Sequence, residues 1–295
     1  DLHGGLGRKF GSIGVALKEP SLVLEAAPAD KLQIEGLEHE RTKVFAQRFF
    51  QRYAPEHRRL LGMGAYLRVV KAIPPHMGFG SGTQLALAIG VALTRLYDLD
   101  ITVFDLAKTM ERGRRSGIGI CTFQHGGFIV DGGMENNHGE KTIPPMIFRQ
   151  PFPADWLFVV ATPQVGIGLS DEAELTAFHE LPPPPPEIVG HICRLLVMKM
   201  LPSLIERKIS PFGEAMTRIN QLVGDIFSDV QGRRYAGIAP ERLVAYMLEQ
   251  GAYGAGQSSW GPTVYGLVKG EEQAQSLAEA VRSFVEGKWK STVFY

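Results

Sequence analysis

Two spacings of apolar residues alternate along the chain, and each predicts a different element. Short segments rich in apolar residues, alternating at 65–73 and continuous at 156–162, predict strands at residues 21–34, 65–73, 156–162, 263–268 and 291–295. Helical spacing predicts helices at residues 35–53, 83–96, 101–112, 188–208, 212–228, 240–250 and 271–287. In the second of these helices almost every residue is apolar, which predicts a helix that is buried on all sides.

The composition of the chain changes near Gln150, where the proline-containing segment QPFPADW precedes an apolar strand. This change predicts a domain boundary, which gives an N-terminal domain of residues 1–152 and a C-terminal domain of residues 153–295. Five consecutive prolines, Pro182 to Pro186, predict an extended connector within the second domain.

Composition excludes several classes of protein. Lys plus Arg equals Asp plus Glu at 31 each, so no overall field attracts nucleic acid or a membrane surface. The two cysteines, Cys121 and Cys193, show no disulfide or zinc spacing, which favours a reducing cytoplasm. We find no signal peptide and no apolar run long enough to cross a bilayer, so we expect a soluble protein. The chain begins at Asp1 without Met, and we expect the natural start to lie upstream.

A glycine-rich stretch, IPPHMGFGSGTQLALAIG, is the first candidate for chemistry. It places Gly78, Gly80 and Gly82 with Ser81 and Thr83 directly before the apolar helix. Glycine allows the backbone to approach a ligand, and the N–H groups at a helix start favour an anion. The pattern therefore indicates a phosphate site, and the alternative is a tight strand-to-helix turn without a ligand. His76 is a candidate phosphate contact or proton donor, or an ordinary loop histidine.

Two further stretches join glycine to arginine or lysine. The first twenty residues carry Arg8 and Lys9 among five glycines, which is typical of a ligand-facing loop or of a solvated one. Arg112, Arg114 and Arg115 precede Ser116 in a second such stretch. Arginine forks match the geometry of phosphate and carboxylate, although three nearby arginines also fit a solvated patch.

The last glycine-rich stretch is GAYGAGQSSWG, at residues 251–261. It has more glycines than a hairpin turn needs, and it carries hydrogen-bonding side chains, so it predicts a loop that lines a site. Its candidate binding residues are Gly254, Gly256, Gln257, Ser258, Ser259 and Trp260. The tryptophan would stack on an aromatic ring or fill the core.

Taken together, these stretches resemble the motifs of the GHMP kinase superfamily. Residues 74–83 resemble its phosphate-binding signature P-x-x-x-G-L-G-S-S-A, and GAYGAGQSSWG resembles its C-terminal glycine motif. The resemblance implies an α+β fold of two domains. Each domain would have a mixed or antiparallel sheet with helices packed on it, and the site would lie in the cleft between the domains.

The chain departs from the kinases at two positions. Gly82 stands where the second serine of the kinase signature helps to hold magnesium, and Gly119 stands where the kinases usually carry a catalytic aspartate. Without that carboxylate, ordinary phosphoryl transfer loses a principal catalytic group.

One branch of the superfamily, the beta-ribofuranosylaminobenzene 5'-phosphate synthases, fits these departures. DLHGGLGRKFGSIGVAL, GLSDEAELTAFHELPPPPPEI and GQSSWGPTVYG resemble that branch in the same order. The resemblance implies condensation of phosphoribosyl pyrophosphate with 4-aminobenzoate or 4-hydroxybenzoate, with release of carbon dioxide and pyrophosphate, in methanopterin biosynthesis. It also implies a homodimer, and with the cysteine usage above we expect a cytoplasmic one. We expect Mg²⁺ with the pyrophosphate substrate and no organic cofactor.

The reaction needs holders for phosphate and carboxylate groups and has little need of a strong base. The residues expected to take part in catalysis are Lys9, His76 and Arg114. The residues expected to bind phosphate or substrate are Arg8, Gly78, Gly80, Ser81, Gly82, Thr83, Arg115, Ser116, Gly254, Gly256, Gln257, Ser258, Ser259 and Trp260. The magnesium ligands are not identified, and the candidate carboxylates are Asp131, Asp171, Glu172 and Glu174. Two alternatives stay open, a small-molecule kinase of the superfamily and a catalytically silent module that binds a phosphorylated metabolite.

Overall fold

The structure is a computed structural model that describes residues 1, 4–57, 60–136, 142–164, 181 and 183–295. The chain forms two compact units. The first contains residues 1–75 and 80–151, and the second contains residues 76–79 and 152–295. Four residues of the glycine-rich loop therefore group with the second unit, although the helix that follows them belongs to the first.

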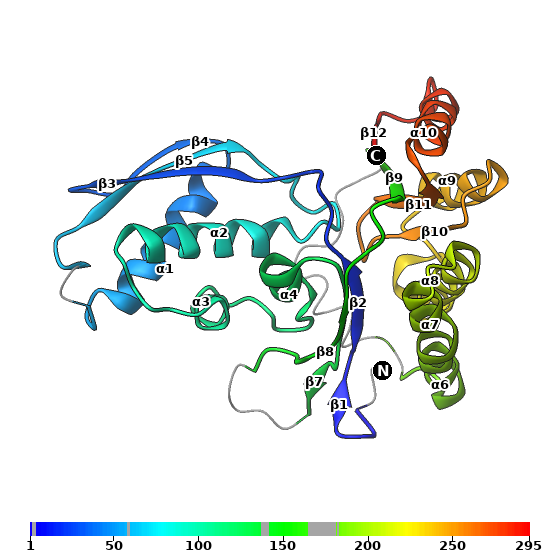
Figure 1. The fold of residues 1–295 in the computed structure, drawn as a ribbon, viewed down its shortest axis with the longest axis horizontal. Helices are drawn as coiled ribbons and strands as arrows, with labels where there is room; N and C mark the ends of the chain where they lie inside the picture. The colour runs from blue at the N-terminus through cyan, green and yellow to red at the C-terminus, as the bar shows by residue number, and fades with distance from the viewer. Residues whose placement is uncertain (2–3, 58–59, 137–141, 165–180, 182) are drawn as a thin grey trace. The chain divides into compact units, whose positions relative to one another are not determined.

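A three-stranded sheet forms one layer of the first unit (Figure 1). Its strands are β3 (Val23–Ala29), β5 (Gly64–Lys71) and β4 (Gln33–Gly36), in the order β3-β5-β4. β3 is antiparallel to β5 and β4 is parallel to it. Three helices accompany the sheet, α1 (His39–Tyr53), α2 (Ser81–Leu96) and α3 (Val103–Thr109).

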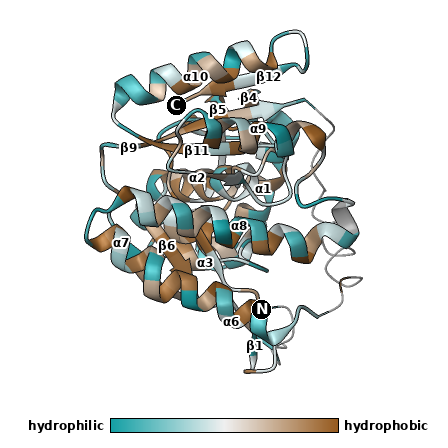
Figure 2. Cartoon of the chain, turned by 90° about the vertical axis from the view of Figure 1, so that its right-hand side faces the viewer, coloured by the Kyte–Doolittle hydropathy of each residue, from teal (hydrophilic) through white to brown (hydrophobic). Residues whose placement is uncertain are grey.

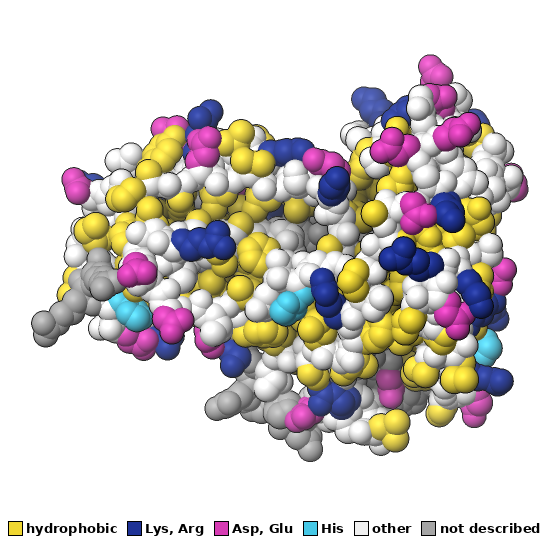
Figure 3. Space-filling model, viewed as in Figure 1, with side chains coloured by type: hydrophobic (Ala, Val, Ile, Leu, Met, Phe, Trp, Pro, Cys, Tyr) yellow, Lys and Arg dark blue, Asp and Glu magenta, His cyan; other side chains and the backbone are white. Residues whose placement is uncertain are grey.

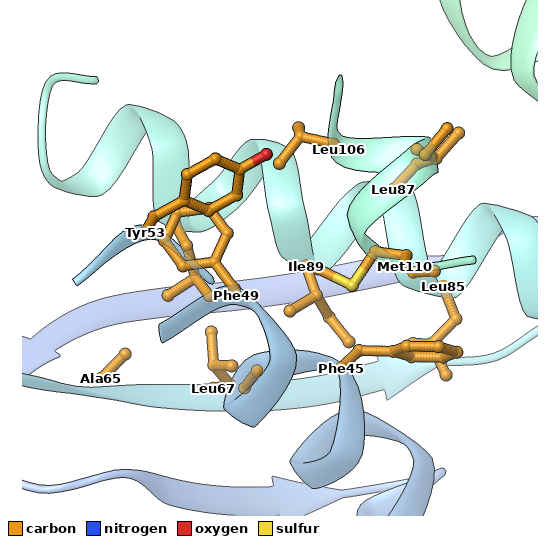
Figure 4. Packing of buried hydrophobic residues seen from close by; sticks show 14 of the residues in the cluster. Phe45, Phe49, Tyr53, Ala65, Leu67, Leu85, Leu87, Ile89, Leu106 and Met110 are labelled. Atoms are coloured by element: carbon orange, nitrogen blue, oxygen red, sulfur yellow. The ribbon is translucent and has the colours of Figure 1, made fainter. Parts of the chain in front are cut away.

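The core of the first unit joins α1 and α2 to β5 (Figure 4). Phe45 and Phe49 of α1 lie with Leu85 and Ile89 of α2, and all four side chains are buried. On α2, the absence of a side chain at Gly90 lets Leu106 of α3 approach to 3.0 Å from the position that a Cβ atom would take. The apolar spacing of α1 and α2 thus fixes how these helices pack against the sheet.

The remainder of the first unit has two small sheets and one further helix. One sheet has the order β2-β6-β8 and the other pairs β1 with β7. Their bounds are β1 Arg8–Lys9, β2 Ser12–Val15, β6 Phe128–Asp131, β7 Met134–Glu135 and β8 Met146–Gln150. The helix, α4, comprises Ile118–His125, and its first residue lies against β2, where a Cβ atom on Gly14 would be 2.3 Å from Cγ2 of Ile118.

The second unit is built on an antiparallel sheet in the order β10-β11-β9-β12. These strands are β9 (Trp156–Pro163), β10 (Gly254–Gln257), β11 (Val264–Lys269) and β12 (Ser291–Phe294). The helices are α8 (Ile209–Gln231), α9 (Ile238–Glu249) and α10 (Glu271–Val285). Buried residues of α9 and α10 share one apolar cluster with β9, β10 and β11. The sheets and helices of the two units confirm the predicted α+β class.

A helical stretch from Pro186 to Ile205 corrects the expectation that no segment is apolar enough to cross a bilayer. It consists of α6 (Pro186–Leu195), the π-helical turn η2 (Leu196–Met200) and α7 (Leu201–Ile205). By length and composition alone it qualifies, and apolar residues are visible along it in Figure 2. A single helix of this kind is weak evidence for a membrane span, because helices of soluble proteins pass the same test. This one also carries Arg194 and Lys199.

Charged side chains of both signs are interspersed on the face of the molecule shown in Figure 3. This distribution agrees with the equal numbers of basic and acidic residues. An anion site in this protein therefore has to be built locally.

Two predicted elements need correction, and one helix was not predicted. The helix expected from residue 35 begins at His39, because Gln33–Gly36 pairs with β5 and Gly36 and Glu38 then take φ of +80° and +54°. Helix α4 was not predicted, since its eight residues include a glycine and show little amphipathic spacing. The stretch expected as a lining loop, residues 251–261, contains the buried strand β10, Gly254–Gln257.

Candidate functional site

Two of the predicted glycine motifs meet within the second unit. The side-chain hydroxyl of Ser258 donates a hydrogen bond of 2.8 Å to the backbone oxygen of Gly78. A Cβ atom on Gly78 would lie 2.4 Å from the backbone oxygen of Ser258, and one on Gly261 would lie 2.8 Å from the backbone carbon of Met77. Gly78 also has φ of +80°, so two independent features require glycine there. The loop before α2 and the C-terminal motif therefore fit together backbone against backbone.

Helix α2 begins as an anion-binding helix would. Its N-cap residue, Gly80, has φ of +67° and provides no side chain to cap the first N–H groups. The first turn contains Ser81, Gly82 and Thr83 and no acidic residue. Uncapped N–H groups and the positive end of the helix dipole favour a negative charge at this position. Ser81, Gly82 and Thr83 thus lie where the sequence predicted a phosphate cradle.

Two arginines lie beside the first turn of α2. A Cβ atom on Gly82 would be 2.9 Å from Nη2 of Arg41 and 3.4 Å from Nη1 of Arg112. Arg112 belongs to the predicted arginine group, whereas sequence reasoning missed Arg41. The sequence places Arg41 three residues after Glu38, a spacing typical of a surface ion pair, and only the packing of α1 beside α2 brings it to Gly82.

The position at which the kinases usually carry aspartate is closed. Gly119 lies in the first turn of α4, and a Cβ atom there would be 3.2 Å from Cγ2 of Thr83. The side-chain amide of Gln84 donates a hydrogen bond of 2.8 Å to the backbone oxygen of Gly119. A side chain at residue 119 would press on the side chain of Thr83, which would have to shift slightly to admit it.

Asp131 holds four donors from separate segments. Its Oδ1 accepts from the backbone N–H groups of Ser12 and Gly133, both at 3.0 Å. Its Oδ2 accepts from the backbone N–H of Gly117 at 2.8 Å and from the hydroxyl of Ser116 at 2.9 Å. Asp131 is 2 % exposed, so its carboxylate acts as an internal link that fixes the start of α4. These bonds argue against Asp131 as a magnesium ligand. They also show that the hydroxyl of Ser116, a predicted substrate-binding residue, is bonded to Asp131.

The N-terminal cations have different surroundings. Arg8 donates from Nε to the backbone oxygen of Gly132 and from Nη2 to that of Gly133, both at 2.7 Å, and it pairs with Glu135 at 3.0 Å. Arg8 therefore fastens β1 to the segment after β6. Lys9 is exposed on the same short strand, and its predicted catalytic role stays a prediction.

The other predicted arginines and His76 lie at the surface or near it. Arg114 forms an ion pair of 3.0 Å with Glu111, and its side chain is 54 % exposed. Arg115 is half-buried and has interactions of its own. His76 is exposed in the loop, with φ of +57°. Of the arginine group, the structure places Arg112 beside the start of α2.

Much of the C-terminal motif is engaged in packing. Gly254 and Gly256 lie in the buried strand β10, against Gly213 and Asn220 of α8. Gln257 is 6 % exposed; its amide donates to the backbone oxygen of Ser259 and accepts from the backbone N–H of Ala236.

The residues of the turn after β10 differ in their burial and in their contacts. Trp260 is 7 % exposed, and its ring centroid lies 4.6 Å from that of Phe227. Of its two predicted roles, filling the core therefore fits the structure. Ser259 is exposed, and Ser258 forms the bond to Gly78 described above. Of the candidate binding residues in this motif, Ser259 is therefore the exposed one.

No cluster of three or more His, Cys, Asp or Glu side chains with the geometry of a metal site occurs among the described residues. The candidate carboxylates Asp171, Glu172 and Glu174 lie outside them.

Burial, with a smaller effect from the charge of Asp131, raises the pKa of the Cys121 thiol. The thiol therefore stays protonated and is a poor nucleophile.

Residues 42–127 match the GHMP kinases N terminal domain, and residues 200–287 match the GHMP kinases C terminal family. The chain therefore belongs to the GHMP kinase superfamily. Within the superfamily, the chain is 34% identical to beta-ribofuranosylphenol 5'-phosphate synthase of Archaeoglobus fulgidus over 98% of this chain and 89% of that protein. It is 32% identical to the enzyme of the same name from Methanothermobacter thermautotrophicus, over 95% of this chain and 88% of that protein. The named relatives confirm that the chain is an enzyme of the synthase type.

Solved structures show the same fold at lower sequence identity. Homoserine kinase of Cytophaga hutchinsonii has a TM-score of 0.64 and 18% identity, covering 96% of this chain and 87% of its own. Mevalonate kinase of L. major, solved in complex with R-mevalonate, has a TM-score of 0.66 and 17% identity, covering 92% of this chain and 83% of its own.

Replacing Gly119 by aspartate, the residue that the kinases usually carry there, is expected to produce no kinase. The new side chain would press on Thr83, so we expect the free energy of unfolding to fall by about 1–3 kcal/mol. Chemical denaturation measures the stability, and ATP turnover with homoserine or mevalonate measures the activity. Gly119→Ala, which adds Cβ without the carboxylate, is the matched control. Phosphoryl transfer by Gly119→Asp would show that the missing carboxylate alone separates this chain from a kinase.

Proposed function

We propose that this enzyme condenses phosphoribosyl pyrophosphate with 4-hydroxybenzoate and releases carbon dioxide and pyrophosphate. The observation that carries the proposal is identity of 34% over 98% of the chain to a beta-ribofuranosylphenol 5'-phosphate synthase. A ribofuranosyl phenol is the product expected when the benzoate carries a hydroxyl group, which favours 4-hydroxybenzoate over 4-aminobenzoate. The place of the reaction in methanopterin biosynthesis, in a cytoplasmic homodimer, is part of the same proposal.

The proposed chemistry has three coupled bond changes. The ring carbon that bears the carboxylate forms a bond to C1 of the ribose, and the bond from C1 to the diphosphate oxygen breaks. The electrons of the bond to the carboxylate then return to the ring as carbon dioxide leaves, which restores aromaticity. No step removes a proton from an attacking hydroxyl group, so the reaction does not need the base that kinases use.

The described residues suit this chemistry because they offer anion binding rather than a base. The uncapped start of α2 can stabilise the charge that develops on the leaving diphosphate. Gly119 provides no carboxylate beside it. We propose that Mg²⁺ arrives with the diphosphate as part of the substrate, because Mg²⁺ is commonly bound through substrate phosphates with few protein ligands. Lys9 and Arg114 stay candidates for binding the benzoate carboxylate or the remaining phosphate, and His76 stays a candidate phosphate contact or proton donor to the leaving group.

A labelled substrate tests the proposal directly. The protein is incubated with Mg²⁺, phosphoribosyl pyrophosphate and 4-hydroxybenzoate labelled in the carboxyl group, and labelled carbon dioxide and pyrophosphate are measured. We expect the two products in equal amounts and a slower reaction, or none, with 4-aminobenzoate. ATP with homoserine or mevalonate forms the parallel assay. ATP turnover without carbon dioxide from either benzoate would favour the kinase alternative, and binding without any turnover would favour the silent module.

A further inference from the structure

We propose that Asn220 of α8 is a positioning residue for the substrate: it fixes the turn after β10, and through that turn it fixes the glycine-rich loop before α2. This inference rests on the proposed function, in which that loop binds phosphate groups of the substrate. Helix α8 lies beside β10 (Figure 1), and Asn220, the turn and residues 76–79 of the loop all belong to the second unit.

Asn220 binds both backbone groups of one residue in β10. Its Nδ2 donates to the backbone oxygen of Gln257, and its Oδ1 accepts from the backbone N–H of Gln257, both at 2.9 Å. One turn earlier on α8, the hydroxyl oxygen of Thr217 accepts from the backbone N–H of Ala255 at 2.8 Å. Within the described sheet β10 is an edge strand, so these side chains of α8 take the place of a neighbouring strand.

Glycines in both elements allow this close contact. A Cβ atom on Gly256 would lie 2.7 Å from Cγ of Asn220, and one on Gly254 would lie 2.3 Å from the backbone oxygen of Gly213 in α8. Such distances leave no room for a side chain. The glycines that the sequence suggested for substrate binding therefore admit α8, and they let the short side chain of Asn220 reach both groups of Gln257.

The residue that follows Gln257 carries the contact to the loop. The backbone oxygen of Gln257 belongs to the peptide group that leads into Ser258, so the bond from Asn220 fixes the direction of the chain at Ser258. The hydroxyl of Ser258 in turn donates to the backbone oxygen of Gly78 at 2.8 Å. Gly78 precedes Gly80, the N-cap of α2, by two residues. A short series of printed bonds thus joins α8 to the loop.

The kinetics of carbon dioxide release test the effect on the substrate. We expect Asn220→Ala to raise KM for phosphoribosyl pyrophosphate about 10- to 50-fold, because a displaced loop binds the phosphate groups less well. We expect kcat and KM for 4-hydroxybenzoate to change less than about threefold. The matched control is Thr217→Val, which removes a bond from α8 to the same strand but farther from the turn. Its KM values should change less than about threefold.

Hydrogen exchange at the turn tests the link without turnover. The backbone N–H of Ser258 donates to the oxygen of Thr263 at 2.9 Å, and that of Gly261 donates to the oxygen of Ser258 at 3.2 Å. We expect Asn220→Ala to speed the exchange of both N–H groups about 5- to 30-fold. Thr217→Val should speed it less than about twofold.

Thermal unfolding identifies variants that fail to fold, and Asn220→Asp serves as the second variant. It keeps the acceptor for the N–H of Gln257 and loses the donor to its oxygen, so we expect KM between those of the wild type and Asn220→Ala. An unchanged KM for phosphoribosyl pyrophosphate in a folded, active Asn220→Ala variant overturns the inference and leaves the proposed function standing. An equal rise in KM for Thr217→Val also overturns it, because α8 would then stabilise the unit without directing the turn.

If the enzyme releases no carbon dioxide, hydrogen exchange decides. Faster exchange at the turn in Asn220→Ala, with Thr217→Val unchanged, then supports the positioning and counts against the reaction alone. Unchanged exchange in a folded Asn220→Ala variant overturns the positioning as well.

Discussion

Replacing Asp131 by alanine is expected to lower the free energy of unfolding by about 3–5 kcal/mol. Three backbone N–H groups and one hydroxyl would lose their acceptor in a part of the first unit where Asp131 is 2 % exposed. The links of Ser12, Ser116 and Gly117 to one another would be lost together. Urea denaturation followed by circular dichroism measures the change.

The control for this prediction is an aspartate at the surface. Asp155 pairs with Lys269 at 3.7 Å, and both side chains are 53 % exposed. Asp155→Ala should therefore change the free energy of unfolding by less than about 0.5 kcal/mol. If Asp131→Ala were as mild as the control, the carboxylate would not be the acceptor that organises the start of α4.

Replacing Gly78 by alanine is expected to lower the free energy of unfolding of the second unit by about 2–4 kcal/mol. The new Cβ would lie 2.4 Å from the backbone oxygen of Ser258, and φ of +80° adds strain for any residue with a side chain. We also expect the carbon dioxide assay to lose most of its signal, since the loop would move from the C-terminal motif. All three tryptophans of the chain, Trp156, Trp260 and Trp289, lie in this unit, so their fluorescence reports its unfolding.

Gly80 provides the matched control, because it has a similar φ of +67° but no atom of another residue within 4 Å of a Cβ position. Gly80→Ala should therefore show only the cost of the backbone conformation, about 1–2 kcal/mol. Because Gly80 belongs to the first unit, circular dichroism, which reports both units, measures the two variants alike. Equal losses for the two variants would mean that the close approach of Gly78 to Ser258 contributes nothing to stability.

The sequence predicted the elements whose apolar spacing is long and regular. Helices α2 and α10 lie within a few residues of their predicted bounds, since each buries a continuous set of side chains that the spacing reveals. Helix α4 was missed because eight residues show too little periodicity, and its position depends on Asp131 rather than on its own pattern. The strand β10 was taken for a loop because its glycines, which allow α8 to approach, resemble turn residues.

The candidate site was predicted in part. The glycines before α2 could be found because a strand, a glycine-rich loop and a helix follow one another in the sequence. Arg41 could not be found in this way, because it lies 40 positions before Ser81, the first residue of α2. Only tertiary packing brings Arg41 to the start of that helix. In the C-terminal motif, polar side chains suggested a ligand, but Gln257 satisfies backbone groups of its own unit. A buried amide and a ligand-binding amide look the same in sequence.

The grouping of residues 76–79 with the second unit limits how this protein can be divided. A cut between Pro151 and Phe152 would divide the chain where the first unit ends and the main part of the second begins. Residues 76–79, which group with the second unit, would remain on the N-terminal fragment. The C-terminal fragment would then lack the partner of Ser258 and Gly261, and the N-terminal fragment would carry a loop without its support. The two halves are thus not interchangeable modules, and recombination between relatives has to keep the loop and the C-terminal motif from the same parent.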